Sequence, residues 1–182
     1  MKKALLFFIF LFSLFSATGQ TTETFENIPT DAQTFTTGGV TFNLSSPYNF
    51  VVYGNRPDLG YNSSDKFIHV LDPLPLGSVN PYGQTGKLKI ASGSFKLNSF
   101  WLYLSGDAMQ NPNATRDGQP GNATIKGKLA GNTQFTIVKP VTGTSIGNAL
   151  PGNGFELIDL ATAGGANNTN VSIDELEITL SN

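Results

Sequence analysis

The chain has 182 residues, of which 11 are lysine or arginine and 13 are aspartate or glutamate. If Lys2 and Lys3 near the N-terminus are left out, the chain has 9 basic and 13 acidic residues, a net charge of −4. Charged residues make up only 13% of the sequence and form no basic cluster, which argues against a nucleic-acid partner or a charged membrane surface. With no cysteine and a single histidine, the chain cannot form disulfides, thiolate metal sites or zinc sites of several imidazoles.

The first nineteen residues have the pattern of a secretory signal peptide. Lys2 and Lys3 precede an apolar run over residues 4–15, and the small residues Ala17 and Gly19 come just before Gln20. The run is too short to span a bilayer comfortably, and no second apolar segment follows it. We therefore expect a signal peptide over residues 1–19, one domain over residues 20–182, and a secreted protein, extracellular or periplasmic, with no membrane insertion after cleavage.

The rest of the chain has the pattern of short β-strands. Apolar and polar residues alternate over residues 40–44, 87–90 and 124–129, and no stretch has apolar residues at helical spacing for three turns. Further strands are expected at residues 22–28, 49–53, 66–71, 94–104, 133–139, 155–160 and 171–180. About ten strands separated by Gly, Pro and Asn turns predict an all-β protein, a two-sheet antiparallel β-sandwich.

Two of these strands differ from the others. Residues 100–104 are apolar or aromatic on both faces, which predicts a central strand covered on both sides. In the last strand Val171 and Ile173 have one parity, whereas Leu176 and Ile178 have the other. A β-bulge near Asp174 would bring both halves to the same inward face.

The sequence has no catalytic motif. It contains no nucleophile elbow, Walker-type loop or His-Glu-x-x-His pattern. A glycosidase needs a pair of carboxylates, but any chain with thirteen acidic residues contains such pairs, so they do not indicate an enzyme. His69 shares its strand face with Phe67 and Leu71, which favours a buried or edge imidazole. We therefore expect a non-catalytic protein, with a glycan-active enzyme as the lesser alternative.

Trp101 and Tyr103 are the first candidates for ligand binding. They lie two residues apart on one face of a strand, about 6 to 7 Å along it. Two flat rings at this spacing could stack on the C–H faces of a sugar. The favoured alternative is that both rings fill the sandwich core, because large aromatic residues are usually buried.

Two long loops provide the second set of ligand-binding candidates. Residues 54–62 and 105–121 exceed ordinary hairpin turns, and long loops on a sandwich commonly carry binding residues. Their planar and charged side chains suit saccharide recognition, although solvated loop decoration explains them equally well. The candidates in these loops are Arg56, Asp58, Tyr61 and Arg116.

A calcium site is predicted from the two ends of the mature chain. Glu26 lies near the start and Asp174 at the predicted bulge, and the two would meet if the first and last strands pair. Carboxylates beside the exposed carbonyls of a bulge suit Ca²⁺, which takes six to eight oxygen ligands. The favoured alternative is that both are surface acids without a metal.

Short motifs at both ends of the mature chain resemble a known group of sandwiches. The segments at residues 24–27, 153–160 and 173–178 are similar to those of the jelly-roll, galactose-binding-like domains of secreted bacterial carbohydrate-binding modules. The resemblance implies a jelly-roll topology, a carbohydrate or cell-surface glycan as partner, and a structural calcium ion held by Glu26 and Asp174.

These observations predict a secreted, non-catalytic domain that binds glycan through loop and aromatic side chains. The alternative is an extracellular structural or adhesive protein that interacts with other proteins. The sequence leaves the oligomeric state open.

Overall fold

The computed structural model describes residues 20–45, 49–53, 66–71, 83, 85–104, 121–141 and 155–181. All of the strands in these ranges pair in antiparallel fashion. No helix within them has the length and hydrophobicity needed to cross a membrane. The all-β antiparallel fold predicted from the sequence is confirmed.

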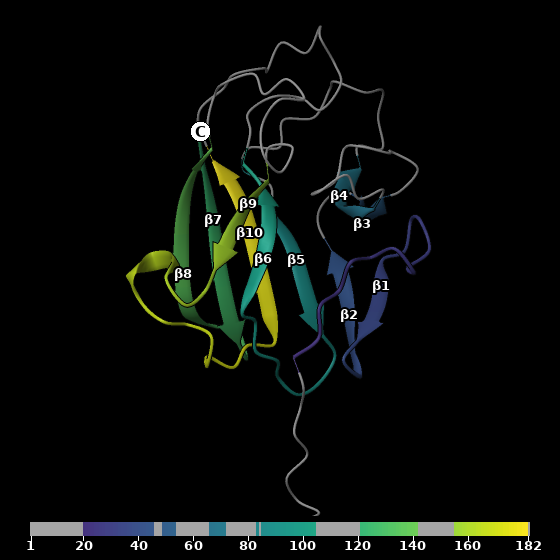
Figure 1. Ribbon diagram of the computed structural model, residues 1–182, viewed down its shortest axis with the longest axis horizontal. Helices are drawn as coiled ribbons and strands as arrows, with labels where there is room; N and C mark the ends of the chain where they lie inside the picture. Colours follow the sequence, from purple (N-terminus) through teal and green to yellow (C-terminus); the bar gives the residue numbers. More distant parts are fainter. Residues whose placement is uncertain are drawn as a thin grey trace, which may run out of the picture.

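Six strands form the main sheet, in the order β1-β2-β5-β10-β7-β8 (Figure 1). Their bounds are Thr34–Thr37 (β1), Val40–Ser45 (β2), Thr85–Ile90 (β5), Glu175–Ser181 (β10), Gly121–Leu129 (β7) and Asn132–Val141 (β8). Two smaller sheets pair β3 (Asn49–Tyr53) with β4 (Phe67–Leu71) and β6 (Ser99–Tyr103) with β9 (Phe155–Asp159). The main sheet is not closed into a barrel, because β1 and β8 are its two edges.

In Figure 1 β6 and β9 lie in front of the main sheet, whereas β3 and β4 lie at one end of β1 and β2. Ile125 of β7 and Ile137 of β8 belong to the same buried cluster as Ile158 of β9. A second cluster joins Phe42 of β2 to Val52 of β3. The predicted layering of sheets is thus present, but the second layer consists of two separate strand pairs.

Tight turns connect neighbouring strands of the main sheet. Ala130 and Gly131 join β7 to β8 with φ angles of 49° and 80°, and Gly38 and Gly39 join β1 to β2 with φ angles of 56° and 76°. A two-residue turn with two positive φ angles matches the right-handed twist of a hairpin, and glycine adopts these angles without strain. These turns fix the register of both hairpins.

The strand predicted at residues 22–28 is wrong. This segment forms turns: the N–H of Ile28 donates to the carbonyl of Phe25 at 2.9 Å, and Phe25 has a φ of 65°. The Phe25 ring packs edge-on against Phe35, with centroids 5.2 Å apart, so the segment covers the core rather than joining a sheet. The first strand among the described residues is β1, whose sequence contains one large apolar residue, Phe35, and so shows too little alternation to be predicted as a strand.

The change of parity predicted near Asp174 is present, but it occurs at a bend before the last strand rather than at a recorded β-bulge within it. Ile173 and Leu176 are both buried although they lie three residues apart. Asp174 between them is a bend, and β10 begins only at Glu175. The change of parity therefore occurs just before the strand, where Ile173 forms an isolated bridge with Phe95.

Candidate functional site

Trp101 is exposed on the outer face of the β6–β9 sheet. It lies directly opposite Leu157, and the two residues are 40% and 45% exposed. Their neighbours Phe100 and Leu102 have the opposite parity and pack against the core. The prediction of a central strand covered on both sides is wrong, as is the prediction that Trp101 fills the core, because only one face of β6 is covered by the main sheet.

Two further residue pairs flank Trp101 and Leu157 in the register of this sheet: Tyr103 with Phe155, and Ser99 with Asp159. The carboxylate of Asp159 accepts the N–H of Ala161 at 2.9 Å and so holds the turn after β9. The side chain of Tyr103 lies outside the described part of the protein. Of the two predicted aromatic residues, the structure thus shows Trp101 exposed, with Leu157 opposite it across the sheet. The sequence did not reveal this position of Leu157.

The remaining ligand candidates lie outside the described residues. These are Arg56, Asp58, Tyr61 and Arg116. The signal peptide lies outside them as well, as does the side chain of His69, whose backbone belongs to β4. Their assignments stay predictions.

The strand pairing on which the calcium prediction rests is wrong. β10 lies between β5 and β7, and Glu26 lies in the turns before β1 rather than in a strand beside β10. One carboxylate oxygen of Asp174 accepts the N–H of Ala130 at 2.9 Å, which gives this side chain a structural role at the β7–β8 turn. Among the described residues, no three acidic or histidine side chains gather as a metal site would require.

Calcium binding by Glu26 and Asp174 stays a prediction that a melting experiment decides. A structural ion stabilises the folded state by mass action, so the melting midpoint should fall when EDTA replaces calcium chloride. An unchanged midpoint would contradict the site. The variant Asp174→Asn should remove the calcium dependence while its side-chain oxygen still accepts the N–H of Ala130.

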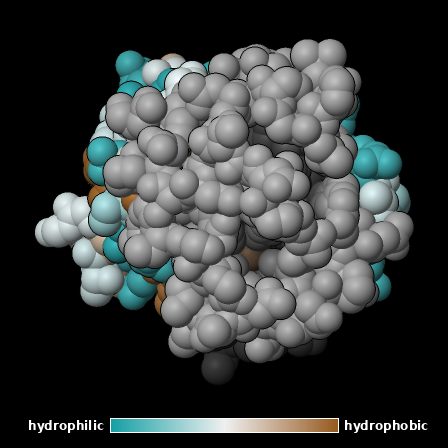
Figure 2. Space-filling model, turned by 90° about the horizontal axis from the view of Figure 1, so that it is seen from above, coloured by the Kyte–Doolittle hydropathy of each residue, from teal (hydrophilic) through white to brown (hydrophobic). Residues whose placement is uncertain are grey.

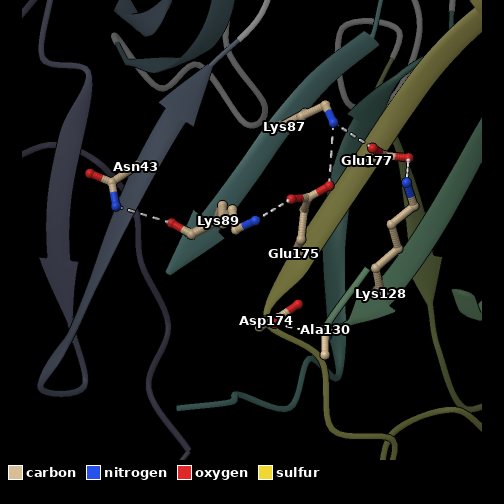
Figure 3. A network of polar contacts seen from close by, with 8 residues as sticks. All are labelled: Asn43, Lys87, Lys89, Lys128, Ala130, Asp174, Glu175 and Glu177. Atoms are coloured by element: carbon tan, nitrogen blue, oxygen red, sulfur yellow. Dashed lines mark hydrogen bonds and ion pairs between the residues drawn. The ribbon is translucent and has the colours of Figure 1, made fainter. Parts of the chain in front are cut away.

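A Lys–Glu cluster lies on the outer face of the main sheet and comprises Lys87, Lys89, Lys128, Glu175 and Glu177 (Figure 3). Lys87 reaches both glutamates, at 3.4 Å to Glu175 and 2.7 Å to Glu177. Lys89 lies 3.1 Å from Glu175, and Lys128 lies 2.6 Å from Glu177. Three strands thus contribute to one continuous ion-pair network.

The two carboxylates of the cluster are nearly buried, at 7% exposure for Glu175 and 8% for Glu177. Burial by itself raises the pKa of Glu177, but hydrogen bonds from Lys128 and Lys87 outweigh it and lower the pKa from 4.5 to about 2. The hydrogen bond to Glu177 in turn raises the pKa of Lys87. Both partners therefore stay charged over the physiological pH range.

A shallow groove lies at one end of the main sheet, with a volume of about 290 Å³. It is formed by the start of β2 and by the residues that follow β5. Its lining is small and uncharged: Gly39, Val40, Thr41, Ile90, Ala91, Ser92, Gly93 and Ser94. The groove offers hydroxyl and backbone groups but no charged side chain that would fix a ligand.

Hydrophobic surface also occurs on the opposite side of the protein from Trp101. Val138 of β8 is 56% exposed, whereas its neighbour Ile137 points into the core cluster that β9 covers. In Figure 2 brown residues interrupt the teal surface along the left flank, the side on which β8 lies in Figure 1. Val138 therefore serves as an exposed apolar control for Trp101.

These features define an all-β antiparallel protein with one six-stranded sheet, partly covered by smaller sheets, and they assign no family. No protein-family model matches the chain, and searches of curated proteins and of solved structures found no match.

Proposed function

We propose that this protein is a secreted, non-catalytic binding domain that takes carbohydrate on the outer face of the β6–β9 sheet. The exposed indole of Trp101 carries the proposal. Trp101 is 40% exposed on a sheet face, so its indole can stack on the apolar face of a sugar ring. Leu157, directly opposite, extends the same apolar surface.

The rest of the fold is consistent with a binding role. The main sheet and its two core clusters give the β6–β9 sheet a packed support, and binding surfaces on rigid elements lose little entropy when a ligand docks. Arg56, Asp58, Tyr61 and Arg116, in the segments that the sequence predicts to be loops, would add hydrogen-bonding groups. We further propose a jelly-roll path for the chain, which the insertion of the last strand between β5 and β7 favours.

A glycan array probed with the wild-type protein and with Trp101→Ala tests the proposal. We expect the wild type to bind a subset of neutral glycans and Trp101→Ala to bind them about twofold to tenfold more weakly, because stacking on an aromatic ring contributes on the order of 0.5–1.5 kcal/mol. Trp101→Phe should retain part of the affinity.

Val138→Ala is the matched control, because it also removes an exposed apolar side chain but on the opposite layer. It should bind as the wild type does. Equal binding by the wild type and Trp101→Ala would contradict the proposal. No binding to any glycan on the array, together with concentration-dependent self-association in ultracentrifugation, would instead favour the structural or adhesive alternative.

A further inference from the structure

Positive charge is concentrated on the outer face of the main sheet. Lys126 lies on this face beside the Lys–Glu cluster. Its two neighbours along β7, Ile125 and Gly127, are buried on the inner face, and successive residues of a strand point to opposite faces. The face thus carries four lysines against two glutamates. Those four are almost half of the 9 basic residues outside the leader, whereas the two glutamates are only 2 of 13 acids.

The positive charge exceeds what the cluster itself neutralises. Lys87, Lys89 and Lys128 share two carboxylates, and Lys126 forms no ion pair with any described residue. The ammonium-bearing side chains of Lys87 and Lys89 are 40% and 56% exposed, so a ligand can reach them. An excess of two positive charges therefore faces solvent on a protein that is acidic overall.

Uncharged hydrogen-bonding groups flank these lysines on the same and neighbouring strands of the sheet. The hydroxyls of Thr85 and Thr179 lie 2.7 Å apart on β5 and β10. Asn43 of β2 donates its amide to the Lys89 carbonyl at 3.4 Å and leaves its own carbonyl oxygen available. The face thus offers ammonium groups for anions and hydroxyl and amide groups for sugar hydroxyls.

We propose that the outer face of the main sheet binds an acidic polysaccharide, with Lys126 and Lys89 as its principal contacts to the ligand's carboxylates. Charge complementarity selects an anionic chain, and the flanking hydroxyl and amide groups suit its neutral hydroxyls. Two surplus charges are too few to neutralise the dense phosphates of a nucleic acid, so a sparsely charged polysaccharide fits better. The carbohydrate class rests on the proposed function, but the surface is separate from that of Trp101.

Affinity electrophoresis of the purified mature protein in gels containing polygalacturonate tests this inference, with dextran as the neutral polymer. We expect retardation by polygalacturonate but not by dextran at 50 mM salt, and weaker retardation at 300 mM because the lysines are screened. Lys126→Gln should weaken the apparent affinity about threefold to tenfold. Its fold should be intact, because Lys126 has no ion pair with another described residue to lose.

The matched control is Lys96→Gln, which removes an exposed charge from the connection between β5 and β6. It should bind polygalacturonate as the wild type does. The inference is overturned if Lys126→Gln and Lys96→Gln have equal effects, if dextran retards the protein as strongly, or if a DNA duplex binds more tightly than polygalacturonate.

The same experiment separates this inference from the proposed function. Binding to polygalacturonate that survives Trp101→Ala but falls with Lys126→Gln supports the lysine surface, even if no neutral glycan binds. Binding that falls with Trp101→Ala and is unaffected by Lys126→Gln overturns the lysine surface and leaves the Trp101 proposal standing.

Discussion

Gly127→Ala should destabilise the protein by about 2–3 kcal/mol, although it adds a single methyl group. Gly127 lies opposite Phe135 in the β7–β8 register, and a Cβ atom at Gly127 would overlap the Phe135 ring. The ring belongs to the buried core cluster, so it cannot move aside without disturbing its neighbours. Phe135 occupies the space that a side chain at position 127 would need, which makes glycine a packing requirement here.

Urea denaturation of the single and double variants checks this prediction. Phe135→Leu removes part of the ring and should itself destabilise the protein, but it also frees space for the new methyl group. The double variant Gly127→Ala/Phe135→Leu should therefore be more stable than the sum of the two single effects predicts, by about 1 kcal/mol or more. Strict additivity would show that the overlap with the ring is not the cause.

Strand positions could be predicted where one face of a strand is apolar and the other polar. β2 shows this alternation over Val40–Ser45, with Phe42 and Leu44 buried, as expected. β6 shows why the rule fails elsewhere. Its apolar residues occupy both faces, and the sequence does not reveal whether a further layer covers the second face. Whether Trp101 is exposed depends on that layer, so the sequence could not separate a platform from a core residue.

The Lys–Glu cluster was missed for a different reason. The sequence contains its signal, since Lys87 and Lys89, Lys126 and Lys128, and Glu175 and Glu177 each lie two residues apart with an apolar residue or glycine between them. This spacing predicts charged outer faces on three strands. The ion pairs form only because β10 lies between β5 and β7, and strand order depends on long-range packing that local patterns do not encode.

Glu177→Gln should lower the stability of the protein by about 2 kcal/mol at pH 7 and remove much of its stability change between pH 5 and pH 2. The folded pKa of Glu177, about 2, lies below its ordinary value of 4.5. A carboxylate with a lowered pKa stabilises the fold fully above its unfolded pKa, and that contribution is lost as pH falls towards the folded pKa. Glutamine also leaves three lysines of the cluster facing only Glu175.

Urea denaturation repeated from pH 7 to pH 2 measures this contribution, and Glu156→Gln is its control. Glu156 is an exposed carboxylate of β9, so replacing it should change stability by less than about 0.5 kcal/mol and should preserve the wild-type pH profile. Lys87 sets a corresponding limit at alkaline pH, because its pKa is raised. Its contribution to the stability of the fold is fully present below its ordinary pKa of 10.5 and is lost as pH rises through the raised pKa. If Glu177→Gln and Glu156→Gln gave the same acid profile, the nearly buried ion-pair network could not be the origin of the acid sensitivity.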